Sequence, residues 1–203
     1  MINLQKGQRI NLKKDDGNTL QNLCVGINWG AIEKKGFLGM GKSKEAVDLD
    51  GSCALFDENK RLLDVVYFGQ LRSKDGSISH SGDDLTGDMS GDDGLDNEVL
   101  TVDLNKLNPA VAHIAFVLNS FQGQDFATIP FASIRIYEGS AKRVNNVFAT
   151  YDIANSAAFA GHVSMVMGVF YKKNNEWKFN AIGEPTKDRK LEETVNTVAS
   201  NYL

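Results

Sequence analysis

Apolar and polar positions alternate in short stretches of this chain, which is the pattern of strands rather than helices. Residues 23–29 (LCVGINW) and 100–104 (LTVDL) alternate with a period of two, which predicts half-buried strands. Other short runs are rich in β-branched and aromatic residues, and the central ones do not alternate; the runs cover residues 61–68, 113–118, 134–137, 162–171 and 176–182. The central runs of this kind indicate strands that are buried on both faces.

Turn residues and one change of period complete the prediction of the fold. The sequence KKNNE at 172–176 separates two apolar runs as a hairpin turn does, and KDGS at 74–77 is also turn chemistry. Near the end of the chain Leu191, Val195, Val198 and Tyr202 share one helical face, which predicts a C-terminal helix that covers a sheet. We therefore expect an all-β fold, a β-sandwich of two mostly antiparallel sheets with a C-terminal helix.

The composition is that of a globular protein. The 203 residues are 42% hydrophobic and 24% charged, and no shift in composition divides them, so we expect a single domain over residues 1–203. The glycine-rich stretch GFLGMG at 36–41 is interpreted as a loop within that domain. A net charge of −4 gives no electrostatic basis for binding nucleic acid.

Several features favour the cytoplasm. No run of about 18 apolar residues predicts a membrane span, and the start of the chain, MINLQKGQRINL, lacks the features of a signal peptide. The two cysteines, Cys24 and Cys53, stand in apolar surroundings and are expected to be buried, reduced thiols.

One segment carries most of the candidate chemistry. Residues 81–98, SGDDLTGDMSGDDGLDNE, hold seven carboxylates and no lysine or arginine, and without them the net charge would be about +3. Four glycines interrupt the acidic residues, and glycine permits the tight reversals that bring carboxylates together. A calcium ion needs about six to eight oxygen ligands. The segment therefore predicts a cation-binding loop, with a solvated or partner-facing acidic loop as the alternative.

The known helical calcium motif does not fit this segment. With Gly94 at the glycine position of an EF-hand loop, Met89 and Gly91 would stand where carboxylates are required. A second acidic piece, Asp48 and Asp50, places two carboxylates on the same side of a strand, where they can reach a shared ion. Taken alone, this pair is equally consistent with a turn at a strand end.

Residues that would support catalysis are sparse. The histidines His113 and His162 stand at the head of apolar runs, where a structural role is expected, whereas His80 directly precedes the acidic segment and is a candidate to contact it. The cysteines lack a Cys-x-x-Cys spacing, and no phosphate-binding glycine loop or Gly-x-Ser-x-Gly motif occurs. We do not expect an enzyme; a metal-dependent phosphatase or nuclease is the least favoured alternative.

Motifs spaced along nearly the whole chain carry a family resemblance. They are VDLD at 47–50, ALF at 54–56, YFGQL at 67–71, SGDDLTG at 81–87, GDD at 91–93, DNEV at 96–99 before the strand at 100–104, GQDF at 123–126, YD at 151–152, and residues 171–183. In this order they resemble the TerD family of tellurium-resistance and general-stress proteins. Two features depart from the family's pattern. The stretch at 89–95 is longer than usual, and Asn97 stands at a position where an acid is common.

The resemblance implies a calcium-binding β-sandwich that confers resistance to tellurite and other stresses. Its motifs imply ligands for one or two Ca²⁺ ions in the acidic loop and the neighbouring strand. With the remaining acid of the loop included, the predicted metal ligands are Asp48, Asp50, Asp83, Asp84, Asp88, Asp92, Asp93, Asp96 and Glu98.

The same resemblance implies partners. We expect other tellurium-resistance proteins, among them a membrane-embedded one, and a cytoplasmic location with attachment to the inner face of the membrane as an option. The oligomeric state is left open. The alternative function is that of a small-ligand binding protein, because some eukaryotic relatives have been described as nucleotide-binding.

Overall fold

The computed structural model describes residues 2–13, 17–35, 42–152 and 157–203, and strands dominate them. The strands are β1 (Ile2–Asn3), β2 (Arg9–Asn11), β3 (Asn22–Trp29), β4 (Ile32–Lys35), β5 (Lys42–Glu45), β6 (Leu49–Phe56), β7 (Leu62–Val66), β8 (Ile78–His80), β9 (Glu98–Asp103), β10 (His113–Ser120), β11 (Ala132–Ser140), β12 (Arg143–Asp152), β13 (Ser164–Lys173) and β14 (Glu176–Thr186). The helical elements among the described residues are the 3₁₀ turns η2 (Phe126–Thr128) and η3 (Ala157–Phe159) and the helix α1 (Leu191–Asn201).

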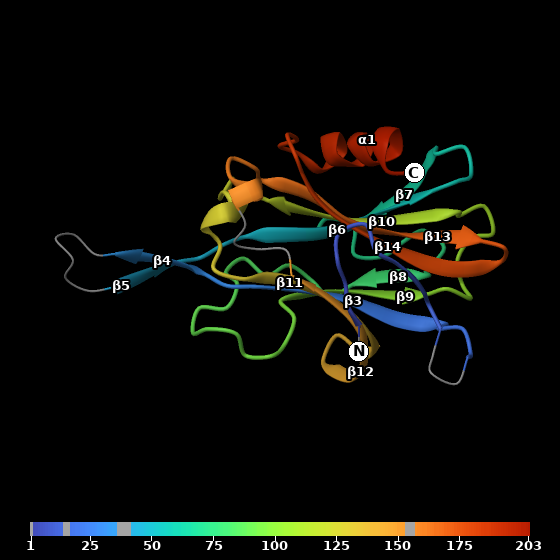
Figure 1. Ribbon diagram of the computed structural model, residues 1–203, viewed down its shortest axis with the longest axis horizontal. Helices are drawn as coiled ribbons and strands as arrows, with labels where there is room; N and C mark the ends of the chain where they lie inside the picture. The colour runs from blue at the N-terminus through green and yellow to red at the C-terminus, as the bar shows by residue number, and fades with distance from the viewer. Residues whose placement is uncertain (1, 14–16, 36–41, 153–156) are drawn as a thin grey trace.

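Two six-stranded sheets stack face to face (Figure 1). The first sheet has the order β1-β12-β11-β3-β9-β8, and the second has the order β2-β14-β13-β10-β6-β7. The described strand pairs are antiparallel except for β1 with β12. The prediction of a sandwich of two mostly antiparallel sheets is confirmed. The β4–β5 hairpin extends away from the sandwich at one end.

The core lies between the sheets, and a second apolar cluster lies under the helix. Along β6, Cys53 and Leu55 point into the sandwich, while Ala54 and Phe56 point outward toward α1. Val195 and Val198 of the helix pack on that outer face, which confirms the predicted role of the C-terminal helix. The runs at 113–118 and 162–171 belong to β10 and β13, which are buried on both faces over most of their length, as predicted for the central runs. The other runs lie in β7, β11 and β14, where buried and partly buried residues alternate.

Strand β3 departs from its prediction. Its alternating sequence predicts one buried face, but seven of its eight residues are buried. Cys24 packs against Val99 and Tyr137 on the outer face of the first sheet, and the acidic loop reaches Asn28 on the same face. The prediction fails because a segment distant in sequence covers the polar face of the strand.

Smaller features agree with the pattern of the sequence. Asn174 and Asn175 form the turn between β13 and β14. Their φ angles of 54° and 59° are the left-handed values of a tight hairpin turn. Both cysteines are free and buried. The predicted loop at 36–41 lies outside the described residues. Within the described part of the chain, no helix is long and apolar enough to cross a membrane.

Candidate metal centre

The acidic loop connects β8 to β9 and is docked against the end of β3. The backbone N–H of Asp88 donates to the Trp29 carbonyl at 3.0 Å, and the N–H of Val47 donates to the Thr86 carbonyl at 3.0 Å. Gly87, at φ 64°, lies against Trp29, and a Cβ there would come within 2.6 Å of the indole ring. The loop is thus part of the fold at this end of the sandwich, where glycine permits the close approach.

Asn97 holds the two ends of the loop together. Its side-chain oxygen accepts the Trp29 N–H at 2.8 Å, while its amide donates to Asp84 at 3.1 Å and to Asp88 at 3.2 Å. The Trp29 indole is fully buried and donates to the Val47 carbonyl at 2.8 Å. One asparagine therefore orients two of the predicted metal ligands.

Asp84 shapes the turn that follows it. Its Oδ1 accepts the N–H groups of Thr86 at 2.9 Å and Gly87 at 3.0 Å. Burial opposes its charge, but the hydrogen bonds from Thr86, Asn97 and Gly87 outweigh burial, so the pKa of Asp84 is lowered. One oxygen of this carboxylate is therefore engaged in holding the backbone.

Three carboxylates from two chain segments meet beside the loop. Asp48, Asp50 and Asp83 offer oxygens that all lie within 4.8 Å of one another; we call them the first acidic group. Asp48 is 3% exposed and Asp50 7% exposed, and the Oδ1 atom of Asp48 is buried without a hydrogen-bond partner. Asp48 directly precedes β6, Asp50 is part of it, and Asp83 comes from the acidic loop.

Burial and the repulsion between neighbouring carboxylates oppose ionisation of the first acidic group. Burial, followed by the charges of Glu98, Asp48 and Asp83, raises the pKa of Asp50 to about 7. Burial and the charge of Asp83 likewise raise the pKa of Asp48. In the part of the chain that the structure describes, none of these three carboxylates forms an ion pair. The charge of His80 offsets only part of this effect at Asp50, and a hard cation would supply further positive charge.

A second acidic group, Asp88, Asp92 and Asp93, lies nearer the solvent and also has oxygens within 4.8 Å of one another. Its carboxylates accept hydrogen bonds from within the loop: the N–H of Asp93 donates to Asp88 at 3.2 Å, and the N–H of Gly94 donates to Asp92 at 2.8 Å. Asn28 of β3 also donates to Asp92, at 3.0 Å. These contacts hold the lengthened part of the loop against the sheet.

Glu98 is fully buried between the sheets. It accepts the Gly51 N–H at 2.7 Å, and its Oε2 lies 3.3 Å from Nε2 of His80. The same Nε2 lies 3.0 Å from the Gly51 carbonyl, while Nδ1 accepts the Gly82 N–H at 3.0 Å. His80 therefore contacts the start of the acidic loop, as the sequence suggested, and Glu98 links the two sheets beneath the first acidic group.

Asp96 is paired within the protein. Nε of Arg135 lies 2.7 Å from its Oδ1, the Asp96 side chain is 2% exposed, and Nη2 of Arg135 donates to the Gly94 carbonyl at 2.9 Å. Asp96 lies over Gly26, where a Cβ would come within 2.0 Å of its carboxylate. Sequence reasoning missed Arg135 in this role; the available signal was a single cation within the apolar run 134–137.

The structure thus divides the nine predicted ligands. Six belong to the first or the second acidic group: Asp48, Asp50, Asp83, Asp88, Asp92 and Asp93. Asp84 supports a turn, Asp96 pairs with Arg135, and Glu98 bridges the sheets. The first acidic group unites two buried carboxylates with a buried, unpartnered oxygen, which makes it the candidate cation site.

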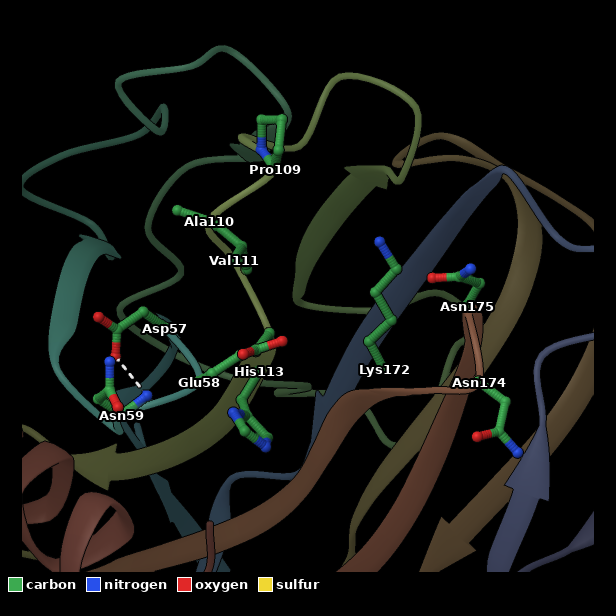
Figure 2. A pocket seen from close by; sticks show the side chains of 11 residues that line it. Asp57, Glu58, Asn59, Pro109, Ala110, Val111, His113, Lys172, Asn174 and Asn175 are labelled. Atoms are coloured by element: carbon green, nitrogen blue, oxygen red, sulfur yellow. Dashed lines mark hydrogen bonds between the residues drawn. The ribbon is translucent and has the colours of Figure 1, made fainter.

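A separate open cleft of about 760 Å³ lies at the other end of the second sheet (Figure 2). Lys172 and Asn175 reach into it from the β13–β14 hairpin, opposite Asp57. His113 borders it, with Nδ1 buried and unpartnered, and burial lowers the pKa of this histidine. None of the predicted metal ligands lines this cleft.

Fold and site together define a class of protein: a β-sandwich that holds an acidic, glycine-punctuated loop against the ends of its strands. The TerD domain matches residues 1–197, and the chain belongs to the TerD family.

Its relatives have names that refer to resistance and stress. The tellurium resistance protein TerZ of Serratia marcescens is 32% identical over 204 residues, covering 100% of both chains. The stress response protein SCP2 of Bacillus subtilis (strain 168) is 34% identical over 205 residues, covering 96% of this chain and 98% of the relative.

Solved structures share the fold. The crystal structure of SCO6318, a homologue of telluride resistance protein (TerD) from Streptomyces coelicolor A3(2), has a TM-score of 0.64 at 19% identity and covers 89% of this chain and 95% of that one. The crystal structure of SAV2460, a protein of unknown function, has a TM-score of 0.64 at 22% identity and covers 88% of this chain and 94% of that one.

Proposed function

We propose that this protein binds Ca²⁺ and acts in the response to tellurite and other stresses as a cation-responsive subunit of a complex, rather than as a catalyst. The observation that carries the proposal is the first acidic group, in which three carboxylates from two separate segments converge without an ion pair in the described chain. The family membership and the names of the relatives support the stress-related role.

The donor set fits a hard cation. Carboxylate oxygens are preferred ligands of Ca²⁺, and two of the three carboxylates are buried, where an uncompensated charge is costly. The unpartnered Oδ1 of Asp48 is a buried acceptor that a cation would satisfy. Because the group joins a loop to a strand, Ca²⁺, with its flexible coordination, suits it better than Mg²⁺, which demands near-octahedral geometry.

The second acidic group is the candidate for a second ion. Asp92 and Asp93 are exposed to solvent, and the carboxylates of the group already accept hydrogen bonds from backbone N–H groups. We therefore assign the stronger site to the first acidic group and the weaker site to Asp88, Asp92 and Asp93.

The position of the first acidic group explains how an ion would produce a response. Asp83 belongs to the loop, Asp48 directly precedes β6 and Asp50 lies at its start, so a shared ion would tie the loop to the sandwich. The surface that the loop presents would then depend on calcium. The partners that read this surface are proposed to be other tellurium-resistance proteins, including a membrane-embedded one, at a cytoplasmic location.

Calorimetry and thermal unfolding of metal-free protein test the proposal. Added Ca²⁺ should stabilise the fold by about 2.7 kcal/mol at a hundredfold excess over Kd, and Mg²⁺ should do less. Asp48→Asn should abolish the strong site, and Asp88→Asn should affect only the weak one. Glu58→Gln, which removes the same charge at the opposite end of the second sheet, is the matched control. An unchanged midpoint at millimolar Ca²⁺ would rule out the assignment.

A further inference from the structure

A cavity of about 380 Å³ lies between the start of α1, the start of β6, the end of β10 and the segment after β7. It shares Asp50 with the first acidic group but is otherwise lined by different residues. Three parts of its wall differ in chemistry: a polar floor, an aromatic side and a cationic rim.

The floor offers buried polar atoms without partners. Ser52 and Asn119 both line the cavity, and Asn119 pairs with Asp50 across the β6–β10 ladder. The Asn119 amide donates to Ser164 at 2.7 Å and to Thr194 at 3.0 Å, so both N–H groups are used. Its carbonyl oxygen is buried and unpartnered, as is the hydroxyl of Ser52. A ligand that donates a hydrogen bond would satisfy the oriented Asn119 acceptor.

The side of the cavity is aromatic and open to solvent. Phe68 stands edge-on to Tyr67, with ring centroids 5.4 Å apart, and edge-on to Phe121, with centroids 5.8 Å apart. Phe121 is 66% exposed and Phe68 38% exposed. Large aromatic side chains that remain exposed beside a cavity favour contact with a flat apolar ligand.

The rim is positive. Arg189 and Lys190 line the cavity directly before the 11-residue helix α1, and Lys190 makes no side-chain cap hydrogen bond. The first turn contains Glu192 and Glu193, and the carboxylate of Glu193 accepts the Arg189 N–H at 2.8 Å. Two cationic side chains next to the positive end of a helix favour an anionic group at this rim.

We propose that this cavity binds a small aromatic anion that carries a hydrogen-bond donor at its other end, such as a hydroxyl or amino group. The anionic group lies at Arg189 and Lys190, the ring lies against Phe68 and Phe121, and the donor reaches the Asn119 carbonyl oxygen. The site does not require a bound ion and so goes beyond the proposed function.

The test titrates 4-hydroxybenzoate, as the probe, into the nitrogen-15-labelled full chain in EDTA. Binding is detected from chemical-shift changes in NMR spectra. Benzoate lacks the donor and phenol lacks the anionic group, so each represents half of the ligand. We expect 4-hydroxybenzoate to bind at least about fivefold more tightly than either, with shifts centred on Ser52, Phe121 and Arg189. Equal binding of the three compounds, or shifts centred elsewhere, would overturn the proposal.

Variants separate this site from the ion site. Phe121→Ala and Arg189→Ala change exposed side chains, so the fold is retained, and each should weaken 4-hydroxybenzoate at least about fivefold. Leu62→Ala, which removes a half-exposed apolar side chain from β7, should leave binding unchanged. Asp48→Asn should remove strong calcium binding and spare the probe. Unchanged affinity in both Phe121→Ala and Arg189→Ala would refute the site, whatever the calcium result.

Discussion

Replacing Asn97 with alanine tests whether one side chain holds the acidic loop on the sandwich. The change removes the acceptor of the Trp29 N–H and the donor to Asp84 and Asp88, three hydrogen bonds of 2.8, 3.1 and 3.2 Å. It leaves the apolar packing of the core untouched, because Asn97 is only partly buried at the edge of the loop.

The expected loss follows from these contacts. A buried N–H left without an acceptor costs about 1–3 kcal/mol, and each of the two partly exposed bonds to a carboxylate contributes about 0.5–1.5 kcal/mol. The three contributions sum to about 2–6 kcal/mol of unfolding free energy, with a midpoint of about 4 kcal/mol. For a chain of this size the midpoint corresponds to a fall in Tm of roughly 8–16 °C.

This loss is measured by urea unfolding in EDTA, with tryptophan fluorescence as the detected signal. The buried Trp29 lies against Gly87, so its emission also reports whether the loop has left the end of β3. Asn105→Ala, at an exposed turn after β9, is the matched control and should change stability by less than about 0.5 kcal/mol. A loss below about 1 kcal/mol in Asn97→Ala, with unchanged Trp29 emission, would refute the role of Asn97.

Three further predictions follow from the packing and the charges. Val198→Ala removes a fully buried contact between α1 and the second sheet and should cost about 2 kcal/mol in urea unfolding; an effect near zero would mean that the helix is not needed there. Gly26→Ala places a Cβ about 2.0 Å from Asp96 and must displace it from Arg135. This change should cost about 3 kcal/mol, and its effect should shrink in an Arg135→Ala background, whereas full additivity would contradict the pairing. Burial lowers the pKa of His113, so the unfolded chain binds its proton more tightly and stability falls as the pH drops through about 6.5. The wild type should therefore lose more unfolding free energy than His113→Gln between about pH 7.5 and pH 5.5, and parallel slopes would exclude this contribution.

Much of the fold could be predicted from local patterns. The period-two and β-branched runs predicted strands, the NN turn predicted the β13–β14 hairpin, and the apolar spacing from Leu191 to Tyr202 predicted the helix. These predictions hold because each depends on neighbours within a few residues. The exception is β3, whose polar face is covered by residues far away in the chain.

The residues of the candidate site could also be predicted from the sequence. Their division into possible metal ligands and carboxylates with a structural role could not. The acidic segment and the Asp48–Asp50 pair are recognisable in the sequence as candidate metal ligands. The spaced motifs indicated the TerD family, to which the chain belongs. No local pattern separates Asp83, which joins the buried pair, from its neighbour Asp84, which supports a turn. The pairing of Asp96 with Arg135 joins two residues 39 positions apart.

The sequence by itself determined many of the strands, the helix, the family and the presence of a carboxylate-rich loop, whereas strands such as β12 were not predicted. Only the tertiary structure decided which carboxylates converge, which ones the protein neutralises, and that Asn119 and Ser52 line a cavity beside them. The physical reason is that local periodicity sets the direction of a side chain relative to its own strand. The partner it meets depends on how strands distant in sequence are aligned, and on which segment covers them.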